Sequence, residues 1–229
     1  MIKEPTVYFD IKLDKETNPN AVWIETSVKD DIIGFHVQHG DAYDVACIDL
    51  GIRVELPSVS SFNTLNVEMT SNDIIVEGEL EFMTDFQLTT VIGNVMLQNA
   101  SANSVVMQTS HGNIQGYFHQ LATSLSANTD YGHIDLDIAS ILQGNKATSE
   151  LKASAISGNI RMNLPKSFYS YFDLTSYSRM PTISPENLPE VHLEATQNKK
   201  HLIGSYGKSA GNKAILSTDI GNAQIRYVM

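Results

Sequence analysis

The chain has 229 residues, enough for one large domain or two small ones, and it can bury a sizeable core without disulfide staples. Acidic residues outnumber basic ones by 26 to 15, and the net charge of −11 opposes binding to nucleic acid or anionic membranes. Cys47 is the single cysteine, which excludes an internal disulfide and a Cys-based zinc cluster. No stretch matches a signal peptide or a membrane span, so we expect no membrane insertion by this chain.

The first sixty residues differ in pattern from the rest of the chain. Alternating apolar residues predict strands over 7–13, 22–28, 33–37 and 52–56. We expect residues 1–60 to form a β-strand cap that packs on the open edge of the repeat that follows.

One motif in this segment could carry chemistry. His36, His39 and Asp41 form a His-x-x-His-x-Asp group, which could supply ligands to zinc or another divalent ion. Residues three apart on a strand point to opposite faces, so the histidines converge only if a turn folds them together. Surface polar residues are the more common explanation, and we expect neither a metal nor a cofactor.

From residue 61 onward a unit of about twenty residues recurs. Its centre is Gly-Asn-apolar, and apolar residues alternate with period two on both sides, which predicts strand, tight turn, strand. Asn takes the Gly place in the first unit because Asn tolerates a left-handed backbone. The predicted structural turn positions are Asn72, Gly93, Gly112, Gly132, Gly158 and Gly221. Two weaker units are centred on Arg179 and Asn198, with an irregular bulge over 181–189.

Stacking such units in chain order buries the apolar face that one unit cannot bury alone. The predicted fold is therefore all-β, a single-stranded β-solenoid of about seven to eight irregular rungs, each of about twenty residues, with an N-terminal β cap. The predicted domains are the cap, residues 1–60, and the solenoid, residues 61–229. The Thr three residues before most turn glycines could form a ladder and bond turn amides, and stacked Asn side chains could form a second ladder.

Several segments resemble a known family. They are Ile52 to Pro57, Leu65 to Met69, Ser71 to Val76 and Ser157 to Pro165, the last reading Ser-Gly-Asn-Ile-Arg-Met-Asn-Leu-Pro. These are similar to the repeated Ser-Gly-Asp/Asn-Ile units of the "putative adhesin" domains, β-solenoid domains of unknown function, and the likeness spans residues 50–229. The resemblance implies a surface or envelope-associated protein with no established catalytic residues, although this chain shows neither leader nor anchor.

Two further motifs invite a catalytic interpretation. Asp135 and Asp137 are two apart on one predicted strand and share a face, as paired acid and base carboxylates or a calcium site would require. Ile134, Leu136 and Ile138 must point inward, which favours an ordinary solvated face for the two aspartates over a catalytic site. Gly207 to Gly211 matches the Gly-x-Ser-x-Gly nucleophile elbow around Ser209, but no histidine follows it and no helix is expected there, which favours a loop.

The remaining polar and aromatic features favour structure or binding over catalysis. His111 and His133 flank turn glycines, where any polar residue would serve. A flat Thr and Asn array could bind ice or glycans, and the aromatic cluster of Tyr169, Tyr171, Phe172 and Tyr177 could stack on sugar rings or pack as core. Asn99 begins the glycosylation sequon Asn-Ala-Ser.

The pattern as a whole predicts a non-enzymatic, adhesin-like structural or binding module whose partner is a glycan or a surface protein. Two alternatives stay open at this stage. One is a carbohydrate-active β-helix enzyme that uses Asp135 and Asp137, and the other is an intracellular assembly scaffold. Cell-surface location follows from the resemblance alone.

Overall fold

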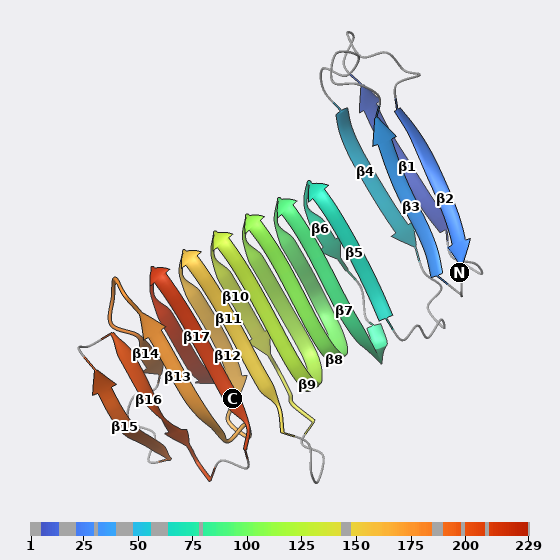
Figure 1. The fold of residues 1–229 in the computed structure, drawn as a ribbon. Helices are drawn as coiled ribbons and strands as arrows, with labels where there is room; N and C mark the ends of the chain where they lie inside the picture. The colour runs from blue at the N-terminus through green and yellow to red at the C-terminus, as the bar shows by residue number, and fades with distance from the viewer. Residues whose placement is uncertain are drawn as a thin grey trace. The chain divides into compact units, whose positions relative to one another are not determined.

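The computed structural model describes residues 6–13, 22–29, 32–39, 48–55, 64–77, 80–142, 148–184, 190–197, 200–208 and 211–228. Every regular element in these ranges is a β-strand, which confirms the predicted all-β class. The chain divides into two compact units, Met1–Ser60 and Ser61–Met229. Figure 1 shows both, the first in blue and the second from blue-green to red.

The first unit contains two antiparallel pairs of strands. β1 (Thr6–Leu13) pairs with β4 (Ile48–Glu55), and β2 (Val22–Lys29) pairs with β3 (Ile32–His39). These are the four strands that the alternation predicts, although β4 begins four residues before the predicted start. The role of this unit as a cap stays a prediction.

The second unit is a single mixed sheet of 14 strands. Its strands are β5 (Thr64–Ser71), β6 (Ile74–Val76), β7 (Leu80–Ile92), β8 (Val95–His111), β9 (Ile114–Tyr131), β10 (Ile134–Ile138), β11 (Glu150–Ser157), β12 (Ile160–Pro165), β13 (Ser170–Ser176), β14 (Thr182–Ser184), β15 (Val191–Gln197), β16 (His201–Tyr206), β17 (Lys213–Ile220) and β18 (Ala223–Val228).

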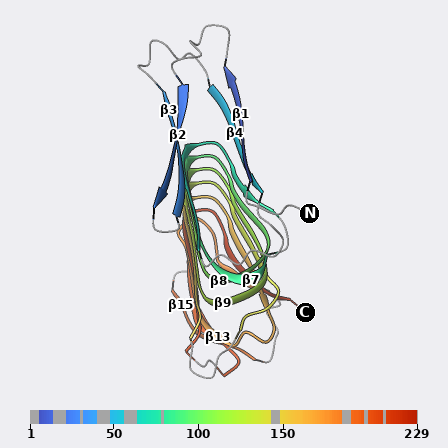
Figure 2. The same cartoon turned by 90° about the vertical axis from the view of Figure 1, so that its right-hand side faces the viewer.

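These strands form stacked rungs, each with a strand that runs into a tight turn and a strand that leaves it. The incoming side consists of β5, β7, the second halves of β8 and β9, and then β11, β17 and β13, all paired in parallel. The outgoing side consists of β6, the first halves of β8 and β9, and then β10, β12, β18 and β14, again in parallel. Figure 2, viewed along the stack of rungs, shows β8 and β9 bending from the outgoing side of the sheet to the incoming side.

The order of the last rungs differs from the prediction. The rung of β17 and β18, at the C-terminal end of the described chain, lies between the rung of β11 and β12 and the rung of β13 and β14. The predicted unit around Asn198 is wrong, because β15 and β16 pair antiparallel with each other and β16 pairs antiparallel with β13. In the predicted bulge over 181–189, Thr182–Ser184 form strand β14 paired with β18, which corrects the prediction there, and residues 185–189 lie outside the described ranges.

The core lies between the incoming and outgoing sides and is built from rows of equivalent residues. One row on the outgoing side contains Val95, Ile114, Ile134, Ile160 and Ala223, each at most 1% exposed. Apolar residues alternate with polar ones on both sides of each turn, so the period-two pattern places one face of each strand in this core.

The turn glycines form a column along one edge of the sheet. A Cβ atom built on Gly112 would overlap the carbonyl oxygen of Gly93, and Gly132, Gly158 and Gly221 each face the preceding turn glycine in the same way. The backbone φ is left-handed at Gly93 (143°), Gly158 (157°) and Gly221 (155°), but Gly112 lies outside that range. Close approach, rather than φ alone, is therefore the shared reason for glycine. Asn72, with φ of 86°, occupies the first of these turns.

Hydroxyl groups on the inner face bond to the carbonyl groups of most turns. The Thr109 Oγ1 donates to the carbonyl of Gly93 at 2.8 Å, and the Thr129 Oγ1 donates to that of Gly112 at 2.9 Å. The equivalent bond, to the carbonyl of the preceding turn in the stack, is made by the hydroxyl groups of Thr90, Thr218 and Ser176. The predicted threonine ladder thus exists, but its hydroxyls donate to turn carbonyls instead of bonding turn amides.

A second ladder joins the residues that follow the turn glycines. The Asn113 backbone N–H donates to Asn94 Oδ1, and the His133 N–H donates to Asn113 Oδ1, both at 2.8 Å. The Asn159 N–H donates to His133 Nδ1 at 2.9 Å, and the Asn222 N–H donates to Asn159 Oδ1 at 3.0 Å. His133 therefore replaces Asn as an acceptor in this ladder, which requires the Nδ1 to be unprotonated.

Substituting Gly112 with alanine tests the glycine column. Because the new methyl group would overlap the Gly93 carbonyl, we expect Gly112→Ala to lower the free energy of unfolding by about 3 kcal/mol. Urea unfolding followed by circular dichroism measures this, and Ser110→Ala should change it by less than about 0.5 kcal/mol. Equal stability of Gly112→Ala and the parent would contradict the close approach.

The hydroxyl ladder has one gap, at Ala155, which occupies the place of Thr129 in the next rung. We expect Ala155→Thr to donate to the Gly132 carbonyl and to raise the free energy of unfolding by about 1 kcal/mol. Ala155→Val has the same shape without the hydroxyl and is the matched control in the same unfolding assay. A gain from valine as large as that from threonine would show that packing, not the hydrogen bond, is responsible.

Candidate functional site

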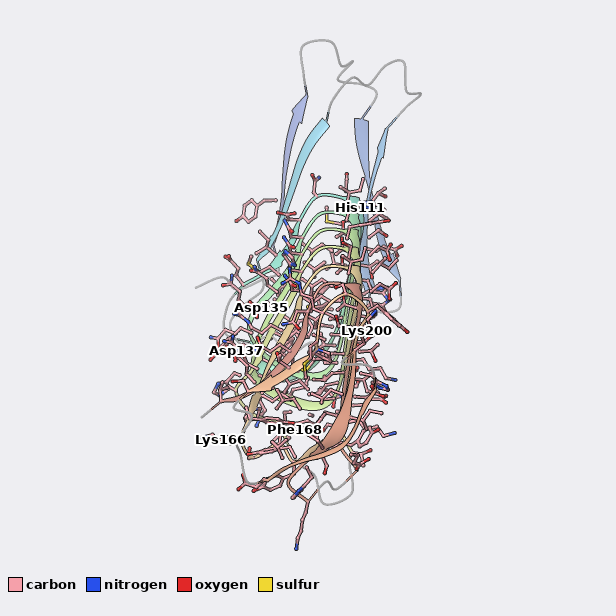
Figure 3. The ribbon with its side chains drawn as sticks, turned by 90° about the vertical axis from the view of Figure 1, so that its left-hand side faces the viewer. His111, Asp135, Asp137, Lys166, Phe168 and Lys200 are labelled. Carbon is pink, nitrogen blue, oxygen red and sulfur yellow. The ribbon has the colours of Figure 1, made fainter. Side chains whose placement is uncertain are left out.

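A shallow depression of about 410 Å³ lies on the outer surface of the outgoing side. Two rows of side chains line it, one residue from each neighbouring strand. Gln115, Asp135 and Arg161 are register partners in β9, β10 and β12, and Tyr117, Asp137 and Asn163 form the second row. Strand spacing places members of a row about 4.8 Å apart. Figure 3 shows Asp135 and Asp137 together on this outer side.

The depression exists because the strand register breaks beside it. The pairing of β8 with β9 shifts between Leu97 and Ala100, and Asn99 in this interval has a φ of 54°. Gln98 and Asn99 thus leave the regular row and form one wall. Asn99 is half-buried and Ser101 in its sequon is 8% exposed, so the sequon does not lie on an open loop.

Asp135 forms a two-pronged ion pair with Arg161. The Arg161 Nε donates to Asp135 Oδ1 at 2.8 Å, and its Nη2 donates to Asp135 Oδ2. This bond raises the pKa of Arg161 above its ordinary value, with the charges of Asp135 and Asp137 adding to the shift and burial opposing it. The pair is partly exposed, so its main effect is to orient both groups, not to stabilise the fold.

The two aspartates predicted to share a face do so, but they have different surroundings. Asp135 is held by Arg161, whereas Asp137 lies between Tyr117 and Asn163 in the second row. The Asn163 Oδ1 is buried and has no hydrogen-bond partner among the described residues. Tyr117 is 44% exposed. The site therefore offers an aromatic face, a carboxylate, an amide and a fixed guanidinium.

The sequence motifs did not identify Arg161, Asn163 or Tyr117 as members of this site. The signal was present in the repeat, because residues at equal offsets from successive turn glycines become register partners. Asp135 and Arg161 both lie three residues after a turn glycine, and Asp137 and Asn163 both lie five after one.

The other predicted motifs are not brought into this site. His36 is the register partner of Glu25 and His39 that of Val22, while Asp41 lies outside the described residues. Within the described ranges, no three His, Cys, Asp or Glu side chains cluster as metal ligands would.

Ser209 also lies outside the described residues, and the next described element after it is strand β17. A nucleophile elbow requires a helix at that place.

Comparison with known proteins agrees with this architecture. The model of the family described as Toastrack DUF4097 matches residues 58–226. The chain belongs to the toastrack family. This match confirms the adhesin-like resemblance seen in the sequence. No curated protein matches the chain.

One solved structure is similar to this toastrack chain. It is the crystal structure of a "putative cell adhesion protein" from Clostridium sporogenes, with 9% identity and a TM-score of 0.39 over 98% of this chain and 100% of that one. No helix in the described part of the toastrack chain is long and apolar enough to cross a membrane.

In the predicted aromatic cluster of the toastrack sheet, Phe172 belongs to the core, whereas Tyr169 and Tyr177 are 42% and 59% exposed. Phe172 is fully buried, and Tyr169 lies against Tyr206 with ring centroids 5.6 Å apart. Tyr206 in turn stacks on Tyr227 at 3.9 Å. Burial raises the pKa of Tyr227 to about 12, and its phenol lies 3.3 Å from the Ser170 Oγ.

This shift predicts a loss of stability in alkali. Below pH 10 the Tyr227 phenol is protonated in both states, whereas between pH 10 and about 12 only the unfolded chain ionises. We expect the free energy of unfolding to fall by about 1.4 kcal/mol for each pH unit in that window. Tyr227→Phe should reduce this slope in urea unfolding, while Tyr177→Phe, at an exposed position, should not. Equal slopes in Tyr227→Phe and the parent would contradict the assignment.

Proposed function

We propose that the chain is a non-enzymatic, adhesin-like binding module of the cell surface, and that its outgoing-side depression binds a glycan. In this role the stacked rungs act as a rigid solenoid that displays the polar outer rows. The observation that carries the proposal is the composition of the depression, where Tyr117, Asp137, Asn163 and the paired Arg161 and Asp135 converge.

This set of groups suits a sugar better than a charged or apolar ligand. The Asp137 carboxylate accepts hydrogen bonds from hydroxyl groups, and the guanidinium and amide N–H groups donate to them. The exposed Tyr117 ring offers a face for the C–H groups of a pyranose. The arrangement is shallow and open, as expected for binding part of a longer chain at the surface.

The pairing of Asp135 favours binding over hydrolysis. A glycosidase needs two carboxylates that change their protonation or bonding during the reaction. The Asp135 carboxylate already receives two bonds from Arg161, which occupy both of its oxygens. A binding site, in contrast, benefits from groups that are fixed in advance.

Surface location is supported by the family resemblance and by the acidic, polar outer rows. The net charge of −11 opposes association with nucleic acid, which leaves glycans and surface proteins as the partners to test.

A glycan array followed by titration calorimetry tests the proposal. We expect the full chain to bind at least one neutral oligosaccharide, and Tyr117→Ala to weaken that binding about tenfold or more. Tyr177→Ala removes an exposed tyrosine outside the depression and should leave affinity unchanged. Absence of any glycan binding, or equal affinity of Tyr117→Ala and the parent, would overturn the proposal.

A further inference from the structure

A second surface feature lies at the tight turns, where one row of side chains directly precedes the turn glycines. The register aligns Ile92, His111, Tyr131, Ser157 and Ile220, one from each successive rung. Ile92, Tyr131 and Ile220 are large and 55–63% exposed. Ser157 is small, whereas its register partners Tyr131 and Ile220 are large, so it leaves a gap between them.

A depression of about 530 Å³ lies at this place, which we call the turn-edge gap. Tyr131 and Ile220 form its walls, and Gly132, Gly158 and Gly221 form a floor of bare backbone. Because the walls belong to strands two places apart, they are separated by about 9.6 Å, twice the strand spacing.

A single ring fits such a gap. The imidazole of His111 and the ring of Tyr131 already stack across one rung, with centroids 5.0 Å apart and planes 23° from parallel. A ring placed over Ser157 would continue this stack at the same spacing on the free face of Tyr131. Its other face would then meet the aliphatic side chain of Ile220.

The polar groups around the gap are cationic or neutral. Arg179, from the turn between β13 and β14, lines the gap, and none of its lining residues is acidic although the chain carries a net charge of −11. His133 Nδ1 accepts from the Asn159 backbone, so the neutral ring carries its proton on Nε2, which can donate to a ligand. A guanidinium and an N–H donor favour a ligand that bears a carboxylate.

We propose that the turn-edge gap binds a sugar ring that bears a carboxylate, such as a uronic acid. The ring stacks on Tyr131 above Ser157, and its carboxylate pairs with Arg179. This site shares no residue with the outgoing-side depression, so either site can fail without the other.

Titration of the full chain with trigalacturonate, using galactotriose as the neutral probe, tests this site. We expect trigalacturonate to bind about tenfold more tightly than galactotriose, and Arg179→Gln to remove that preference. Ser157→Leu should abolish binding by filling the gap. It should leave the fold intact, because the equivalent positions in other rungs already hold large side chains. Tyr117→Ala, in the other depression, should leave trigalacturonate binding unchanged.

Three outcomes would overturn the assignment. The first is failure of trigalacturonate to bind, and the second is unchanged binding by Ser157→Leu whose thermal unfolding matches the parent. The third is tighter binding of a peptide with a carboxyl-terminal phenylalanine than of trigalacturonate, which would assign the gap to an aromatic side chain of a protein partner instead of a sugar.

Discussion

The close approach of each turn glycine to the carbonyl of the preceding turn is the contact on which the second unit depends. It brings successive backbones together at one edge, so that the strands on both sides pair in register over their length. Gly112 is the decisive case, since its φ is not left-handed and yet no side chain fits against Gly93. Threonine hydroxyls inside the turn and asparagine acceptors outside it then satisfy polar groups that this tight stacking brings close together.

A sheet in register repeats every outward side chain as a row, and a perfect repeat would give a uniform surface. Both candidate sites arise where the repeat is broken. The outgoing-side depression forms where a register shift after Leu97 moves Gln98 and Asn99 out of line. The turn-edge gap forms where Ser157 replaces a large side chain in an unbroken register. The regular rungs on either side of each irregularity hold its lining side chains in place through backbone hydrogen bonds.

Much of this architecture was predictable from the sequence. The alternation of apolar and polar residues follows from the two faces of a β-strand, and the Gly-Asn pattern follows from the backbone conformation that a tight turn requires. The alternation also placed Asp135 and Asp137 on one face. It could not supply Arg161, since that contact joins residues 26 apart in the chain and depends on which strand lies next to β10. Equal offsets from turn glycines carry this information only when the rungs stack consecutively, as those of Gly132 and Gly158 do.

The order of the last rungs follows from the same glycine contact. A rung that stacks on Gly158 must present a residue without a Cβ to its carbonyl, and of the three later centres, Arg179, Asn198 and Gly221, only the last qualifies. The chain therefore returns β17 and β18 to that position. The turn after β13 lies at the end of the column and needs no glycine, because Ser178 Oγ instead accepts from the Gly221 N–H at 2.8 Å and donates to its carbonyl at 3.0 Å. The regular spacing of the repeat centres suggested that the rungs stack in chain order. The actual order is decided by which turn can approach the Gly158 carbonyl without a Cβ atom.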